Sequence, residues 1–347
     1  MRKKNKGLEV NELNEKTKSN MVIRTISGLI VAAIFFPLSF LGGWYFFSVM
    51  CVVLIFAIYE MVKSINVGKI NVAVFIFIYI VTISLTFWGF ARQNLIFYHA
   101  NNMFASDVLS YGFSNGALPL YLSPIALVVA IGIMFGVALA SEKVHVQYIS
   151  YYFMMMVLLA ISFQSIFYLR YLPMSQEFSS ASCYGTGLYD YCLSFMLMFY
   201  MLIGSVGNDL GAYFIGVLFG KHKMNERISP KKTWEGFAGG VIFSAGLSIG
   251  VALILDATGH PILPGYLDMN HWYWILLCSI VMPLVATLGD LSFSAIKRHF
   301  NFKDFGNLIP GHGGVLDRLD SISFCAIGLS IFLILIRSGW NFLAWSD

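Results

Sequence analysis

Long apolar stretches separated by short polar connections run through most of the 347-residue chain. A helix needs about 20 apolar residues to cross the hydrocarbon of a bilayer, and nine stretches come close to or exceed that length. They lie near residues 22–41, 44–62, 71–91, 118–140, 148–169, 192–219, 236–256, 272–290 and 319–337. The pattern predicts an all-α, polytopic integral membrane protein of about nine transmembrane helices, some of them broken near the functional site.

Composition supports a membrane protein. Hydrophobic residues make up 58% of the chain, charged residues only 12%, and the mean hydropathy is +0.74, whereas soluble domains carry roughly 25% charged residues. The short connections leave no room for a separate soluble domain. We therefore expect a polar cytoplasmic tail at 1–21, N-terminal transmembrane helices at 22–190, and a catalytic transmembrane region at 191–347.

The basic residues are unevenly divided between the two sides of the predicted membrane. Cytoplasmic loops of membrane proteins are enriched in Lys and Arg. With the N-terminus in the cytoplasm, 19 of the 22 Lys and Arg residues fall inside, and only Arg92, Arg170 and Arg337 fall outside. The net charge of +4 is therefore concentrated on the face where anionic lipids and nucleotides are found.

The five cysteines contain no metal-binding pattern. Cys51, Cys278 and Cys325 lie within spans and are expected to be small core residues. Cys183 and Cys192 lie in or beside an exterior loop, where a disulfide is possible. The pattern argues against a zinc site, because the seven histidines are scattered and no thiols are paired.

A first polar cluster interrupts the apolar span that ends near residue 219. Asn208 and Asp209 lie within it, and a carboxylate at membrane depth costs roughly 2.5–3.5 kcal/mol, so it normally faces a polar cavity. Gly204, Gly207 and Gly211 form a smooth strip for close helix packing. The alternative is a packing helix with one acid that is satisfied by a neighbour.

A second cluster is the basic loop "KHKMNERISPKKTWEG". Taken alone, its five basic residues are explained as a topology signal. However, Thr233 can cap the helix that follows, and Lys231 and Lys232 would then flank a helix N-terminus that favours anions. This loop is therefore a candidate anion site.

The third cluster, "GDLSFSAIKRHFNFKDFGNLIPGHGGVLDRLDS", runs from Gly289 to Ser321. If the helix continues past Asp290, then Asp290, Ser294 and Lys297 share one face. Asp317 and Asp320 share a face at the start of the last span. The "PGHGG" run between these helices supplies flexible backbone that can approach a ligand closely.

Acids and bases alternate through this third cluster. One aspartate near a helix N-terminus is explained as a complement to the helix dipole, but several acids interleaved with Lys and Arg are not. Such a mixture suits a magnesium-bound polyphosphate, because carboxylates hold the hard cation and basic groups neutralise the phosphates. The sequence therefore predicts Mg²⁺, with a second cation as an option.

The run "SAIKRHFNFKDFGNLIPGHGGVLDRLD", from Ser294 to Asp320, resembles the signature of the phosphatidate cytidylyltransferase (CDP-diacylglycerol synthase) family. Every fixed position of that signature is filled over 27 residues. "NDLGAYFIGVLFGKHK" and "ISPKKTWEG" resemble neighbouring segments of the family, although Asn208 stands where many members have another small polar residue. The resemblance covers roughly residues 200–340, and the earlier spans only by hydropathy.

The resemblance implies transfer of CMP from CTP to phosphatidate, with Mg²⁺, at the cytoplasmic face of a bacterial-type inner membrane. It also implies a homodimer, contact with membrane lipids and no nucleic-acid partner. The metal ligands that it implies are Asp290, Asp317 and Asp320. The catalytic residues that it implies are Lys297, Arg298, Asp304, His312 and Asp209. The substrate-binding residues expected beside them are Lys231, Lys232, Thr233, Ser294, Lys303, Gly313, Gly314 and Arg318.

Two alternatives remain at this point. Another CTP-dependent lipid transferase, such as a polyprenol kinase or an archaeal-type CDP-lipid synthase, would share the nucleotide site but differ in its acceptor. A transporter or channel would spread polar residues through several spans at mid-membrane, whereas here they gather toward one predicted side.

Overall fold

The computed structural model describes residues 15–65, 75–85, 124–140, 145–174, 188–311 and 313–337. Its named helices are α1 (Glu15–Leu41), α2 (Gly43–Ser64), α5 (Pro124–Ala140), α6 (Val146–Tyr171), α8 (Leu188–Phe219), α9 (Trp234–Ala257), α10 (Trp272–His299) and α11 (Leu316–Arg337). Short 3₁₀ turns, η1 (Leu172–Met174) and η2 (Met269–His271), and a hairpin of β1 (Lys223–Asn225) and β2 (Ser229–Thr233) complete these elements. The predicted residue His312, the Cys183–Cys192 pairing and most of the tail lie outside what the structure describes.

Six of the described helical segments are long and apolar enough to span a membrane: Tyr45–Ser64, Val146–Tyr171, Phe195–Phe219, Trp234–Ala257, Met269–His299 and Leu316–Arg337. Each coincides with a predicted span. Shorter apolar helices at Ile26–Leu41, Phe75–Leu85 and Leu127–Val137 lie within the other three predicted spans. A polytopic helical protein is therefore confirmed, and the number nine stays a prediction.

Two details of the expected fold were wrong. The helices that carry the polar clusters, α8, α10 and α11, run without interruption past their polar residues, so the expected breaks are absent from these three helices. Irregular backbone lies instead between α10 and α11, at residues 300–311 and 313–315, where Gly311 and Gly313 adopt positive φ. We call this segment the signature loop.

The chain also contains a small antiparallel hairpin that an all-α fold does not include. Strands β1 and β2 pair, with Lys223 opposite Thr233 and Asn225 opposite Ser229. The turn is held by Asn225, whose Oδ1 accepts a hydrogen bond from the Ile228 N–H at 3.1 Å. Asn favours such turns because its side chain can replace a backbone acceptor.

Helices α8, α9 and α10 pack closely because small residues line their contacts. A Cβ on Gly211 would lie 2.7 Å from the Phe243 Cβ of α9, and one on Gly204 would lie 3.0 Å from the Met282 Cβ of α10. Ser244 of α9 also donates a hydrogen bond to the Gly204 carbonyl at 2.9 Å. The predicted glycine strip is thus confirmed as a helix-packing surface, and it serves two neighbouring helices.

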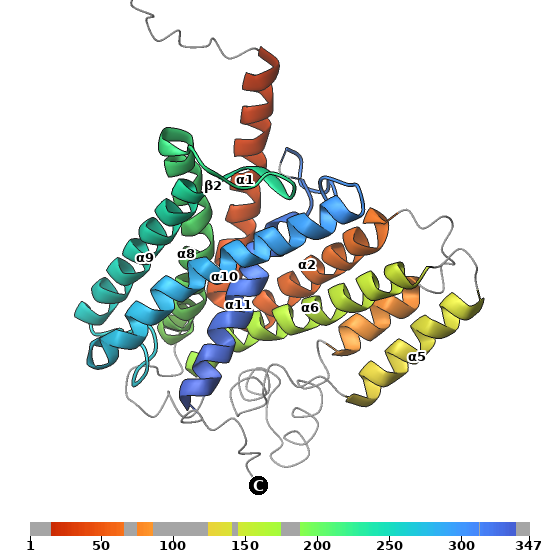
Figure 1. Ribbon diagram of the computed structural model, residues 1–347. Helices are drawn as coiled ribbons and strands as arrows, with labels where there is room; N and C mark the ends of the chain where they lie inside the picture. Colours follow the sequence, from red (N-terminus) through yellow and green to blue (C-terminus); the bar gives the residue numbers. More distant parts are fainter. Residues whose placement is uncertain are drawn as a thin grey trace, which may run out of the picture.

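The hairpin and the signature loop lie at the same end of the helical bundle (Figure 1). Arg298, near the end of α10, joins them: its Nε donates to the Ile228 carbonyl of the hairpin turn and its Nη1 to the Phe302 carbonyl of the loop, each at 3.3 Å. The three polar clusters therefore meet at one end of the fold, although they are separated along the chain.

Candidate functional site

Three helices and one strand bring acids and bases together at this end of the bundle. Asp290 of α10 forms an ion pair with Lys232 of β2. Asp290 Oδ1 also accepts a hydrogen bond from Ser294 at 3.3 Å, one helical turn later. The predicted face of α10 is therefore confirmed, and it faces the basic loop that was predicted to bind anions.

A second ion pair lies deeper. Lys297 Nζ is 2.8 Å from Asp317 Oδ1, with only 10% and 5% of the two side chains exposed. The other oxygen of Asp317 accepts hydrogen bonds from the backbone N–H of Phe305 at 2.8 Å and of Gly314 at 3.2 Å. Asp317 therefore links α10 and α11 and holds both sides of the signature loop.

Asp209, Arg318 and Asp320 complete the cluster. Asp209 of α8, Asp290 of α10 and Asp320 of α11 interact unfavourably with one another, and Lys232, Lys297 and Arg318 oppose this repulsion. Carboxylates that repel one another are stabilised by nearby cations. The arrangement is suited to a ligand that brings both negative phosphates and a metal ion.

The residues fit a hard divalent cation by their chemistry. Among the residues that the structure describes, no three His, Cys, Asp or Glu side chains are arranged to hold one ion together. Mg²⁺ usually takes one or two carboxylates and completes its shell with water and phosphate oxygens. The oxygens of Asp290 contact the side chains of Lys232 and Ser294, whereas Asp317 binds the buried Lys297 and two backbone N–H groups.

Lys231 and Lys232 of the hairpin lie beside the N-terminus of α9, as predicted. Thr233 is the N-cap of α9, and its Oγ1 accepts a hydrogen bond from the Gly236 N–H at 3.1 Å. The predicted cap is confirmed. Lys232 points to Asp290, whereas Lys231 is exposed on the strand, so the two neighbouring lysines have different surroundings.

Loss of this cap should weaken the site without removing a charge. We expect Thr233→Ala to lower the free energy of unfolding by about 1 kcal/mol, because the Gly236 N–H loses its acceptor. Thr233→Ser retains the hydroxyl and should stay near the unsubstituted protein. Thermal unfolding in detergent measures both variants, and equal melting temperatures for Ala and Ser would contradict the capping role.

Other predicted residues have different surroundings. Lys303 and Asp304 are exposed on the signature loop. Arg298 is tied to two backbone carbonyls. Asn208 is buried and donates a hydrogen bond to Thr287 Oγ1 at 2.9 Å, which joins α8 to α10 and explains the Asn of the Asn-Asp pair as a packing residue.

Sequence reasoning missed Glu60 of α2. This side chain is 1% exposed, and its Oε2 accepts a hydrogen bond from the Leu316 N–H, at the start of α11, at 2.8 Å. The signal was available, because an acid within an apolar span has the same cost that drew attention to Asp209.

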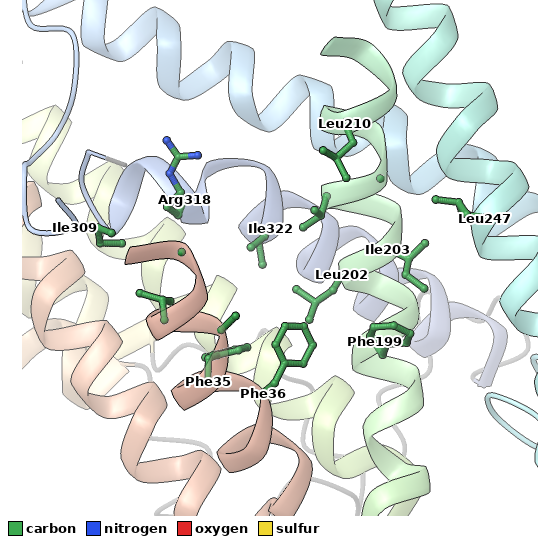
Figure 2. Close-up of a pocket in the computed structure, with 15 residues that line it drawn as sticks. Phe35, Phe36, Phe199, Leu202, Ile203, Leu210, Leu247, Ile309, Arg318 and Ile322 are labelled. Carbon is green, nitrogen blue, oxygen red and sulfur yellow. The ribbon is translucent and has the colours of Figure 1, made fainter. Parts of the chain in front are cut away.

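An apolar cavity of about 440 Å³ lies beside the charged cluster. Figure 2 shows Phe35 and Phe36 of α1, Leu202 and Leu210 of α8 and Ile322 of α11 around it. Arg318 lies at its edge, with the guanidinium pointing away from the apolar side chains (Figure 2). The site therefore has a charged part and an apolar part that share one boundary.

Comparison with known proteins gives close relatives over part of the chain. It is 46% identical over 125 residues to a phosphatidate cytidylyltransferase of Mycobacterium leprae, covering 36% of each protein. It is 45% identical over 126 residues to one from Staphylococcus epidermidis, covering 36% of this chain and 44% of the relative. For the Mycobacterium tuberculosis protein the identity is 44% over 139 residues, covering 40% of this chain and 39% of the relative.

These alignments thus span less than half the length of the curated relatives. A family model extends the similarity well beyond them: the model of the Cytidylyltransferase family matches residues 22–336. That range includes every described helix from α2 to α10, the hairpin, the signature loop and nearly all of α11. Because the match takes in most of its length, this chain belongs to the cytidylyltransferase family.

Proposed function

We propose that this protein is a phosphatidate cytidylyltransferase, which transfers CMP from CTP to phosphatidate and releases pyrophosphate. The observation that carries the proposal is the contact between a charged cluster and an apolar cavity at one end of a membrane bundle. A water-soluble polyanion and a lipid need such a shared boundary to react. The names of the relatives support the same substrates.

The chemistry asks little of the protein beyond placement and charge neutralisation. A phosphate oxygen of phosphatidate attacks the α-phosphorus of CTP, and the bond from that phosphorus to the bridging oxygen of pyrophosphate breaks. The attacking group is already an anion, so a general base is unnecessary. The contribution of Lys232, Lys297 and Arg318 is to hold phosphates in line and offset their repulsion.

We propose Mg²⁺ as the cofactor, with a second cation as an option, and Asp290, Asp317 and Asp320 as its ligand set. Asp290 is favoured for direct contact because its side chain is 23% exposed and its partners are side chains, whereas Asp317 is 5% exposed and binds the backbone of the signature loop. The bound ion would supply charge neutralisation at the phosphates. The remaining members of the predicted site, including His312, Lys303 and Asp304, are proposed around this centre.

The lipid part of the site is proposed to be the apolar cavity. A Trp in place of Leu202 would fill space that an acyl chain needs, and we expect it to raise the KM for phosphatidate about tenfold or more. Leu276→Trp, on an outer face of α10 where Leu276 is 40% exposed, is the matched control. An unchanged KM for the Leu202 variant would show that the cavity does not hold the acyl chain.

The reaction itself is tested in detergent with purified protein, phosphatidate and CTP labelled at either the α or the γ phosphorus. Label from the α position in lipid, dependent on Mg²⁺, supports the proposal. Label from the γ position would instead indicate a lipid kinase. An ether-linked archaeal-type glycerol phosphate and a free polyprenol, each offered in competition with phosphatidate, separate this enzyme from other CTP-dependent lipid transferases.

We also propose a homodimer in a bacterial inner membrane, with the charged end facing the cytoplasm. The orientation is supported by the 19 of 22 Lys and Arg residues on the predicted inner side, because Lys and Arg are enriched in cytoplasmic loops. Light scattering in detergent measures the oligomeric state. A Lys231→Cys variant that also carries Cys183→Ser and Cys192→Ser, labelled by an impermeant maleimide in inverted vesicles and protected in intact cells, would agree with the orientation; the reverse pattern would contradict it.

A further inference from the structure

One buried carboxylate from the N-terminal half of the chain reaches the signature loop. Glu60 lies near the end of α2, is 1% exposed, and accepts the hydrogen bond from the Leu316 N–H at 2.8 Å. Leu316 is the first residue of α11. A carboxylate at that place satisfies a free N–H group and favours the helix dipole. Glu60 therefore stabilises the start of the helix that carries Asp317 and Asp320.

Two glycines of the signature loop leave room for this side chain. A Cβ on Gly314 would lie 2.5 Å from Glu60 Oε2, and one on Gly306 would overlap with Oε1. Real Cβ atoms do not approach other atoms so closely, so a larger residue at either position would displace Glu60 or the loop. The absence of a side chain at both positions is thus matched to a carboxylate from another helix.

Glu60 and Asp317 contact different backbone groups of the signature loop. Asp317 Oδ2 accepts hydrogen bonds from Phe305 and Gly314, while Glu60 contacts the adjoining residues Gly306 and Leu316. Its second oxygen, Oε1, is buried and lies against the loop backbone at Gly306.

We propose that Glu60 is a positioning residue for the active site: it fixes the signature loop and the first turn of α11, and so sets the positions of Asp317 and Asp320. The effect on turnover rests on the proposed cytidylyltransferase activity, whereas the effect on the loop does not. Gly306 and Gly314 serve this contact, and for Gly314 it replaces the close approach to a ligand that the PGHGG run suggested.

The first test is hydrogen exchange, which needs no activity. In Glu60→Ala, peptides that cover residues 303–319 should exchange faster than in the unsubstituted protein, whereas peptides from α9 should be unchanged. Ser64→Ala is the control on the same helix, since Ser64 contacts Tyr151 and the Met61 carbonyl. Unchanged exchange at 303–319 in Glu60→Ala would overturn the proposal.

The second test is a double-mutant cycle measured by CMP transfer to phosphatidate. We expect kcat to fall about 10- to 100-fold for Glu60→Ala and for Gly314→Ala, and Glu60→Gln, which keeps an acceptor for Leu316, to retain more activity than Glu60→Ala. The double variant should lose much less than the two single losses combined, because the new methyl group occupies the space that Glu60 left.

Each outcome of the cycle has one meaning. Losses that multiply independently would mean that Gly314 serves a substrate and not Glu60, and would overturn the proposal. Full activity of Glu60→Ala would do the same. If the unsubstituted protein transfers no CMP, the proposed function fails, and the exchange experiment alone decides the role of Glu60. If Glu60→Ala does not fold, Glu60→Gln is carried through both measurements.

Discussion

Asp290→Asn is expected to reduce CMP transfer at least about 100-fold, the upper end of what is lost when a residue supporting a metal site is changed. The substitution keeps the shape of the side chain and the acceptor for Ser294. It removes the charge that pairs with Lys232 and that repels Asp209 and Asp320. The loss should be in turnover, because a partly exposed ion pair contributes little to stability.

The matched control is Asp256→Asn. Asp256 lies near the other end of α9 from the hairpin, and its Oδ1 accepts a hydrogen bond from the Met269 N–H at 3.1 Å. This variant should transfer CMP at the unsubstituted rate. Steady-state rates over a range of Mg²⁺ concentrations measure both proteins. Normal turnover by Asp290→Asn at every concentration would exclude Asp290 from the metal and phosphate site.

Lys297→Met is expected to lower the free energy of unfolding by about 3–5 kcal/mol. The substitution leaves Asp317 as a buried charge without its ammonium partner, although two backbone N–H groups still bind its other oxygen. The double variant Lys297→Met/Asp317→Asn should recover part of this loss, because no uncompensated charge remains. Neither protein is expected to transfer CMP.

Lys303→Met supplies the stability control, since Lys303 is an exposed basic residue on the same loop and its loss should change stability by no more than about 0.5 kcal/mol. Thermal unfolding in matched detergent gives the melting temperatures of the unsubstituted protein, Lys297→Met, Asp317→Asn, the double variant and Lys303→Met. A double variant as unstable as the sum of Lys297→Met and Asp317→Asn would show that the two side chains act independently.

Local sequence patterns predicted what local geometry determines. The spacing of Asp290, Ser294 and Lys297 placed them on one face, and Thr233 before an apolar run predicted a cap; both depend on residues within a few positions of each other. The identity of the charged partners was not predictable in this way. Lys232 and Asp290 meet because α8, α9 and α10 pack through glycines, and that packing is a property of three helices together.

The role of the N-terminal helices was the largest gap in the prediction. Glu60 contacts a residue 256 positions later, and the Ser27 hydroxyl of α1 donates to the Pro310 carbonyl, 283 positions later, at 2.8 Å. Hydropathy identified these helices but gives no information on what they contact. The proposed division at 190/191 therefore describes the distribution of motifs, while hydrogen bonds cross it in the folded protein.

The distance of 256 residues between Glu60 and Leu316 also has a consequence for biogenesis. A ribosome that adds about 5–20 residues per second reaches Leu316 about 13 to 51 seconds after Glu60. During that interval α2 has been made, and the backbone that satisfies its acid has not. The apolar residues of α2 must therefore suffice for its membrane insertion while Glu60 has no partner. Folding is complete only after the signature loop and the start of α11 have been synthesised.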